Sequence, residues 1–225
     1  WKLYELETSG AIVPDDVKYL VLEQRASYYA IEGEWKKNYE ALLQLESLKL
    51  SATKSVDLQM MIARAENQVS AFNFKSALKR HKYALKLARE LQPPDQGMLL
   101  RVLQHIATLL NNEGKSTEAK PYAEEMLDVC KTMPHDSDYY IKGMTDALVI
   151  LSTFDSQKSE TMLLKMLEKR WPRIYTGVIN GCTETRVVII EDGSDDHAAG
   201  VLEGLLVCWS KACERNVQNA TKQIQ

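Results

Sequence analysis

The sequence predicts an all-α protein made of repeated helical hairpins, with one further helix near its C-terminus. From Asp15 to Arg170 apolar residues recur at spacings of three and four, which indicates amphipathic helices, and almost no segment alternates with a period of two. Helix-breaking residues fall between these helical stretches, at Pro14, Gly33, Pro93, Pro94, Gly114, Pro134 and Pro172. This regular punctuation predicts successive helices joined by turns, and it is typical of repeats.

Small residues mark the repeat. An alanine in the first helix of each predicted hairpin recurs at intervals of 39, 42 and 40 residues, at Ala26, Ala65, Ala107 and Ala147. Two antiparallel helices approach closely only where one presents a small side chain, so we expect these alanines at helix contacts. A four-helix or seven-helix bundle with accidental spacing is the alternative.

The four hairpins follow one another along the chain. Gly33 makes the first turn and is followed by Trp35, whereas Phe72 stands where the second turn glycine would be. The third hairpin is the most regular, with Gly114 at its turn and Pro134 at its end. Glycine suits such turns because it adopts positive φ angles at little cost. We expect the second helices to face inward at Leu42, Ala77, Ala84, Ala119, Ala123, Met126, Ser159, Leu163 and Met166.

This pattern resembles the tetratricopeptide repeat (TPR). The TPR signature has a small residue in the first helix, a turn glycine followed by an aromatic residue, an alanine early in the second helix, and a closing proline. Residues that match it are Ala107, Gly114, Ala119 and Pro134, and also Gly33 with Trp35. The spacing near 40 residues is similar to the extended repeats of kinesin light chains. Over about residues 15–172, the resemblance implies a right-handed superhelical α-solenoid of about four TPR-like hairpins.

The resemblance also implies a concave groove, lined by the first helices, that binds a peptide or a partner helix. When the family's groove positions are carried over by counting from the small residues, the resemblance implies groove positions at Glu23, Ser27, Ile62, Glu66, Val69, Arg101, Gln104, Thr108 and Asn111. Two carboxylates, Glu23 and Glu66, would repel an acidic tail, so we expect a basic or mixed peptide with an apolar anchor for Ile62 and Val69. A solvated face without a ligand is the alternative for each position.

Basic residues gather on the second helix of the second hairpin. They are Lys75, Lys79, Arg80, His81, Lys82, Lys86 and Arg89. Such a cluster is able to meet phosphates, but the whole chain has 28 Lys and Arg against 31 Asp and Glu, a net charge of −3. We therefore favour a solvated basic face over a nucleic-acid interface.

The chain changes character after Pro172. We expect a lead-in over 1–14, the repeat array over 15–172, an extended insert or linker over 173–197, and a capping helix with a polar tail over 198–225. Within the insert, the β-branched run Arg186–Ile190 is expected to form either a short strand or an extended segment laid on the solenoid. Asp195 or Asp196 is expected to cap the last helix rather than bind a metal, because the EF-hand ligand spacing is missing. The apolar stripe of that helix is expected at Val201, Leu202, Leu205, Leu206, Trp209, Ala212 and Cys213.

No catalytic motif is found in the sequence. Nucleophile elbows, Walker loops, dinucleotide-binding glycines and HExxH are missing, and the four cysteines and four histidines form no paired metal motif. We expect no cofactor, free thiols, no membrane span, and an intracellular protein of the cytoplasm or nucleus. Because the chain begins at Trp1, we expect it to be part of a longer protein. A non-catalytic interaction scaffold is the favoured hypothesis; a regulatory domain of a larger enzyme and a nucleic-acid-binding repeat are the alternatives.

Overall fold

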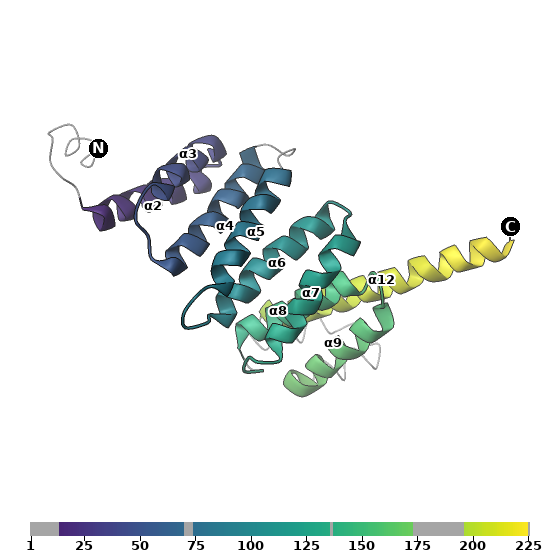
Figure 1. Cartoon of the computed structure of the whole chain (residues 1–225). Coiled ribbons are helices and arrows are strands. Elements are labelled where there is room, and N and C mark those ends of the chain that lie inside the picture. The colour runs from purple at the N-terminus through teal and green to yellow at the C-terminus, as the bar shows by residue number, and fades with distance from the viewer. Residues whose placement is uncertain (1–13, 70–73, 136, 173–195, 225) are drawn as a thin grey trace. The chain divides into compact units, whose positions relative to one another are not determined.

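The computed structural model describes residues 14–69, 74–135, 137–172 and 196–224, with the side chains of the last helix described from 197 to 214. The described residues form α-helices and no strand (Figure 1). In chain order these helices are α2 (Asp15–Ile31), α3 (Trp35–Glu46), α4 (Ala52–Val69), α5 (Phe74–Arg89), α6 (Gln96–Asn112), α7 (Ser116–Cys130), α8 (Asp138–Leu151), α9 (Ser156–Arg170) and α12 (Asp196–Ile224). The all-α prediction is confirmed. Pro121 is an exception to the predicted punctuation, since it lies within α7.

The two predicted turn glycines end their helices in the same way. Gly33 has φ +73° and Gly114 has φ +71°. Beside Gly33, its own N–H donates to Ala30 O and the Glu34 N–H donates to Tyr29 O at 2.8 Å. The bonds around Gly114 repeat this arrangement, in which a left-handed residue lets the last carbonyls of a helix find partners. A side chain at either position would be strained, so the prediction of turn glycines is confirmed.

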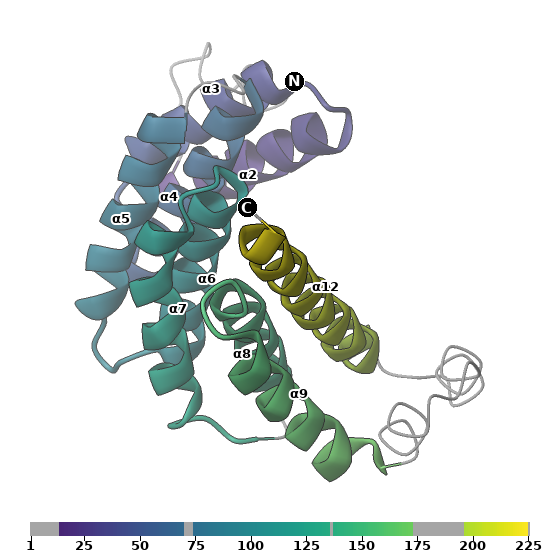
Figure 2. The same cartoon turned by 90° about the vertical axis from the view of Figure 1, so that its right-hand side faces the viewer.

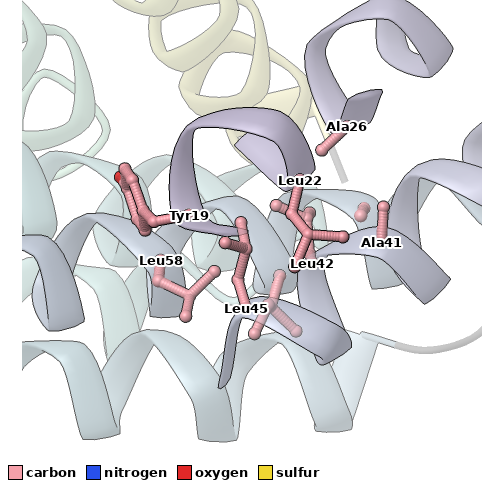
Figure 3. Close-up of a cluster of buried hydrophobic side chains, with 9 residues drawn as sticks. Tyr19, Leu22, Ala26, Ala41, Leu42, Leu45 and Leu58 are labelled. Carbon is pink, nitrogen blue, oxygen red and sulfur yellow. The ribbon is translucent and has the colours of Figure 1, made fainter. Parts of the chain in front are cut away.

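The four repeat alanines are buried. Ala26 is 3% exposed, Ala65 is 1% exposed, and Ala107 and Ala147 are fully buried. In the first hairpins, Ala26 and Ala65 belong to one apolar cluster with Leu22, Leu42 and Leu45 (Figure 3). The small side chains leave room for these leucines to interlock, as the spacing predicts.

The chain folds as two compact units, of which the first ends at Val102 and the second begins at Leu103. In the first unit α2 packs on α3, α3 on α4, and α4 on α5. In the second unit α7 packs on α8, α8 on α9, and α12 on both α8 and α9 (Figure 2). Helix α6 contributes residues to both units. Each unit thus has a core of its own.

Helix α12 packs through a stripe that coincides only in part with the predicted one. Ala198, Val201, Leu205 and Cys208 are at most 1% exposed, whereas Leu206 is 61% exposed. Trp209 is also exposed, and its indole N–H donates to Glu160 Oε1 at 2.8 Å. Successive residues of a helix point in directions about 100° apart. Because α12 packs through positions i, i+3, i+7 and i+10, the apolar residues next to these positions in sequence point away from the packed face. Of the predicted apolar stripe, Val201 and Leu205 are buried, whereas Leu206, Trp209 and Cys213 are exposed.

Some predictions fall on residues outside the described part of the chain. They are the lead-in over 1–13, Phe72, Cys182, the strand near 186–190, and the capping role of Asp195 or Asp196. Within the described residues, Cys130, Cys208 and Cys213 are free thiols. No described helix is long and apolar enough to cross a membrane.

Candidate functional site

A surface cleft of about 320 Å³ lies in the first unit, where α2, α3 and α4 meet. We call it the α2–α4 cleft. Its lining comes from the two first helices of neighbouring hairpins and from the helix between them: Glu23, Ala26, Ser27, Ala30, Ile31, Trp35, Asn38, Leu42, Met61, Arg64 and Ala65. Two of the predicted groove residues, Glu23 and Ser27, are among them.

Alanines make the space at the bottom of this cleft. Ala26 and Ala65 are almost fully buried, and Leu42 is 2% exposed between them. The amide of Asn38, itself buried, donates to the backbone oxygen of Ala26 at 2.7 Å and ties α3 to α2. A buried amide needs such a partner, because an unpaired one would cost about 1–3 kcal/mol. The floor of the cleft is therefore fixed in position.

Glu23 is held at one wall by Tyr19. The Tyr19 hydroxyl donates to Glu23 Oε1 at 2.8 Å, and Lys54 Nζ lies 3.8 Å from the centre of the Tyr19 ring. Burial, together with the hydrogen bond to Glu23 and its negative charge, raises the pKa of Tyr19 to about 12. The phenol therefore stays a donor near neutral pH and keeps the carboxylate of Glu23 oriented.

The cleft combines both charges with apolar surface. Glu23 lies on α2 and Arg64 on α4, and Arg64 is exposed. Among described residues, Arg64 has no carboxylate within ion-pair distance. Ile31, 83% exposed, stands at the rim with the half-buried Trp35. The cleft thus presents groups of both charges beside apolar surface.

The structure places two of the predicted groove residues in the core. Ile62 is fully buried and Glu66 is 5% exposed. Ile62 belongs to the apolar cluster of the first hairpins, so its side chain is not available to a bound peptide. The prediction that Ile62 receives the apolar anchor of a bound peptide is therefore corrected. The groove positions counted from Ala65 are wrong here because Ile62 and Glu66, three positions before and one after this alanine, face neighbouring helices.

Glu66 belongs to a polar network that joins α3, α4 and α5. It accepts a hydrogen bond from the Tyr39 hydroxyl at 3.0 Å, and Arg80 Nε lies 3.7 Å from the same oxygen. Arg80 also donates to Glu46 at 2.5 Å and to Gln59 Oε1 at 3.0 Å. A buried carboxylate needs such compensation. The role of Glu66 in this structure is thus the linking of three helices.

The remaining predicted residues lie on α4 and α6, away from the cleft lining. Val69, at the end of α4, is 44% exposed, and Thr108 is exposed on α6. Asn111 accepts a hydrogen bond from Ser116 Oγ at 3.1 Å. Arg101 pairs with Asp57 of α4 within the first unit, and Gln104 donates to Asp146 of α8 within the second. Arg101 and Gln104 link successive first helices.

Sequence reasoning missed the opposite wall of the cleft. Met61 and Arg64 lie four and one positions before Ala65, whereas Glu23 and Ser27 lie three before and one after Ala26. The offsets differ because each first helix turns one flank to the preceding first helix and the other flank to the following one. A helical-wheel comparison of α2 with α4 would have given this signal.

The basic cluster on α5 divides into two groups. Lys75, Lys79, Lys82, Lys86 and Arg89 are exposed, as a solvated face would be. Arg80 instead pairs with Glu46 and Glu66, and His81 is 5% exposed. No group of three or more His, Cys, Asp or Glu able to hold a metal ion is found among the residues that the structure describes.

No protein-family model and no curated protein matches the sequence. Among solved structures, the chain is similar to a crystal structure of nearly identical TPR-like repeats, from a protein of Podosopora anserina assigned as a kinesin light chain. The TM-score is 0.56 at 15% sequence identity, and the match covers 85% of this chain and 95% of that chain. The chain thus has the fold of TPR-like helical repeats, as the resemblance implied.

Proposed function

We propose that this protein is a non-catalytic interaction scaffold, which binds a peptide segment or partner helix along the groove of its first helices. Repeat folds of this kind serve protein–protein interaction in general, because stacked hairpins present extended surfaces. The observation that carries the proposal is the α2–α4 cleft, which is open to solvent and lined from two successive first helices. Its place within a larger assembly in the cytoplasm or nucleus is part of the same proposal.

The lining of the cleft defines the ligand that we propose. A Lys or Arg of the partner pairs with Glu23, and a carboxylate of the partner pairs with Arg64. An apolar side chain packs against Met61 and Trp35. This is the basic or mixed peptide with an apolar anchor that the sequence predicts, but its anchor contacts Met61 and Trp35 instead of Ile62 and Val69.

The test exchanges the two charges of the cleft. In Glu23→Lys/Arg64→Glu the net charge of the protein stays the same while both proposed pairs become repulsive. The matched control Lys36→Glu/Glu40→Lys makes the same exchange on the exposed face of α3, outside the cleft. Proteins captured from lysate by the wild type and both variants are identified by mass spectrometry. Direct affinities are then measured with peptides from each captured protein.

We expect a partner that the wild type and the control retain and the cleft variant loses. The expected loss of affinity is about tenfold, because each partly exposed pair is worth roughly 0.2–1 kcal/mol and is replaced by repulsion of similar size. Equal binding by all three proteins would exclude the α2–α4 cleft as the binding site.

A further inference from the structure

A second cleft, of about 360 Å³, lies in the second unit between the start of α8 and the end of α9. We call it the α8–α9 cleft. It is lined by His135, Tyr140, Ile141, Met144, Met162, Lys165, Met166, Lys169, Arg170 and Trp171. A volume near the lower end of the range of ligand pockets, about 300–1,000 Å³, has room for a large apolar side chain.

The charge of this cleft has one sign. Lys165, Lys169 and Arg170 line it, and no Asp or Glu is among the described lining residues, although the chain as a whole carries a net charge of −3. On α9, residues at spacings of three and four share a face, which places Lys165 and Lys169 beside Met162 and Met166. Lys165 and Lys169 are exposed, and neither forms an ion pair with any described residue.

The walls of the cleft are apolar and adaptable. Met144, Met162 and Met166 supply flexible, polarisable side chains, which suit surfaces that adjust to a bound segment. The His135 ring packs edge-on against Tyr140, with the ring centres 4.7 Å apart, and the Arg170 guanidinium lies 5.4 Å from the centre of the Trp171 ring. Apolar walls beneath a cationic rim are the complement of an apolar side chain flanked by carboxylates.

Stabilisation of the helix end explains only part of the arrangement. Cations in the last turn of a helix interact favourably with its dipole, and Lys169 and Arg170 lie in that turn of α9. Lys165 lies a turn earlier, where this effect has faded. The helix dipole also gives no reason for the methionine-lined cleft beneath the three cations.

We propose that the α8–α9 cleft docks an acidic segment of a partner protein, with a large apolar side chain inserted between Met144, Met162 and Met166 and the flanking carboxylates on Lys165 and Lys169. This site is separate from the α2–α4 cleft in residues and in charge preference. The protein accordingly has a docking site for an acidic segment in its second unit, whatever the ligand of the first unit.

The experiment uses the full chain labelled with ¹³C at the methionine methyl groups. The probe is the octapeptide Glu-Asp-Glu-Leu-Phe-Glu-Asp-Glu. Two control peptides are a basic one that keeps the Leu-Phe pair between lysines, and an acidic one in which Gly-Ser replaces Leu-Phe. We expect the acidic Leu-Phe peptide to shift the signals of Met144, Met162 and Met166 in a saturable way and to leave Met61, in the α2–α4 cleft, unchanged. Both control peptides should bind at least about tenfold more weakly.

Charge variants locate the contact. Lys165→Glu/Lys169→Glu should weaken the acidic peptide about tenfold, whereas Lys36→Glu/Lys49→Glu, with the same change of net charge on exposed residues of the first unit, should bind as the wild type does. Lys165→Gln/Lys169→Gln, which puts no carboxylate near the C-terminus of α9, should show a smaller loss in the same direction. Circular dichroism confirms that each variant is folded.

Several outcomes would overturn the proposal. They are an absence of saturable shifts up to about 1 mM peptide, equal binding of the basic peptide, and equal loss in both double Glu variants. Shifts of the three methionines that grow with protein concentration in the absence of peptide would assign the cleft to a second copy of the chain, and would overturn it as well. None of these outcomes bears on the α2–α4 cleft.

Discussion

Ala107 has no exposed surface, while the next residue, Thr108, is exposed on the same helix. Ala107→Leu adds three carbon atoms to a closely packed site, and overpacking of this kind costs typically about 1–3 kcal/mol. Thr108→Leu is the matched control and should change the free energy of unfolding by no more than about 0.5 kcal/mol. Urea denaturation followed by circular dichroism measures both. Similar stability of the two variants would mean that the repeat alanine is not at a tight helix contact.

The ionisation of Glu46 makes the free energy of unfolding depend on pH. Burial opposes ionisation of its carboxyl, but the hydrogen bonds from Gln59 and Arg80 and the charge of Arg80 outweigh this effect and lower its pKa below the ordinary 4.5. A carboxyl whose pKa is lower in the folded chain stabilises the fold while it is ionised. Its contribution is complete above about pH 4.5 and is lost as the pH falls through the folded value.

Glu46→Gln should therefore reduce the free energy of unfolding near neutral pH and flatten its decline in acid. Because this side chain is 35% exposed, solvent screens the pair and the effect is modest. Thermal unfolding measured between about pH 7 and pH 3 gives the profile. Glu40→Gln, on the exposed face of α3, controls for the loss of one carboxylate. Indistinguishable profiles for the two variants would contradict the assignment.

Substitutions at two glycines of α12 distinguish the packing of this helix against its neighbours from its intrinsic helix stability. A Cβ at Gly204 would lie 3.3 Å from side-chain carbons of Leu163 and Val149, whereas a Cβ at Gly200 would meet nothing within 4 Å. Gly204→Leu should therefore push α12 from α8 and α9 and cost about 1–3 kcal/mol. Gly200→Leu should stabilise the protein by up to about 1 kcal/mol, because leucine is the better helix former.

Thermal denaturation of the two glycine variants is the measurement. Hydrogen exchange of the amides of α8 and α9 shows in addition whether the loss in Gly204→Leu begins at the α12 contact. If both variants were stabilised, α12 would not be packed against these helices at Gly204, and its role as a cap of the second unit would be wrong.

Whole elements follow from the sequence more readily than their contacts do. Positive φ at Gly33 and Gly114 and the burial of all four repeat alanines are local requirements of a helical hairpin, so spacing alone predicts them. The stripe of α12 is different. Leucines occupy two adjacent flanks of that helix, and only the position of α8 and α9 decides that Leu205 is buried and Leu206 is exposed.

At the scale of the whole molecule, the candidate site shows the same limit. Glu23 and Ser27 were predicted by carrying the groove positions of the TPR family over from Ala26, and both line the cleft. Met61, Arg64 and the whole α8–α9 cleft depend on how neighbouring helices face each other, and no single helix carries that information. Residues near a tertiary contact, such as Ile62 and Glu66, are easily assigned to the surface when the rotation of the helix is inferred from one marker residue.

The two compact units predict that stability is divided along the chain. Repeat proteins gain their stability from each repeat and its neighbours, so a loss in one core is felt mainly nearby. Leu45 and Leu163 are both fully buried, the first in unit one and the second in unit two. Leu45→Ala and Leu163→Ala each remove the same atoms and should each cost about 2–5 kcal/mol. Each variant is thus the matched control of the other.

Hydrogen exchange read by mass spectrometry distinguishes local from global loss. Leu45→Ala should speed exchange chiefly in α2, α3 and α4, and Leu163→Ala chiefly in α8, α9 and α12, because these helices share the affected cores. The mid-helix amides of the other unit should keep most of their protection. If either substitution sped exchange equally throughout the chain, the two units would unfold as one cooperative body, and a peptide bound in one cleft would then stabilise the other unit as strongly as its own.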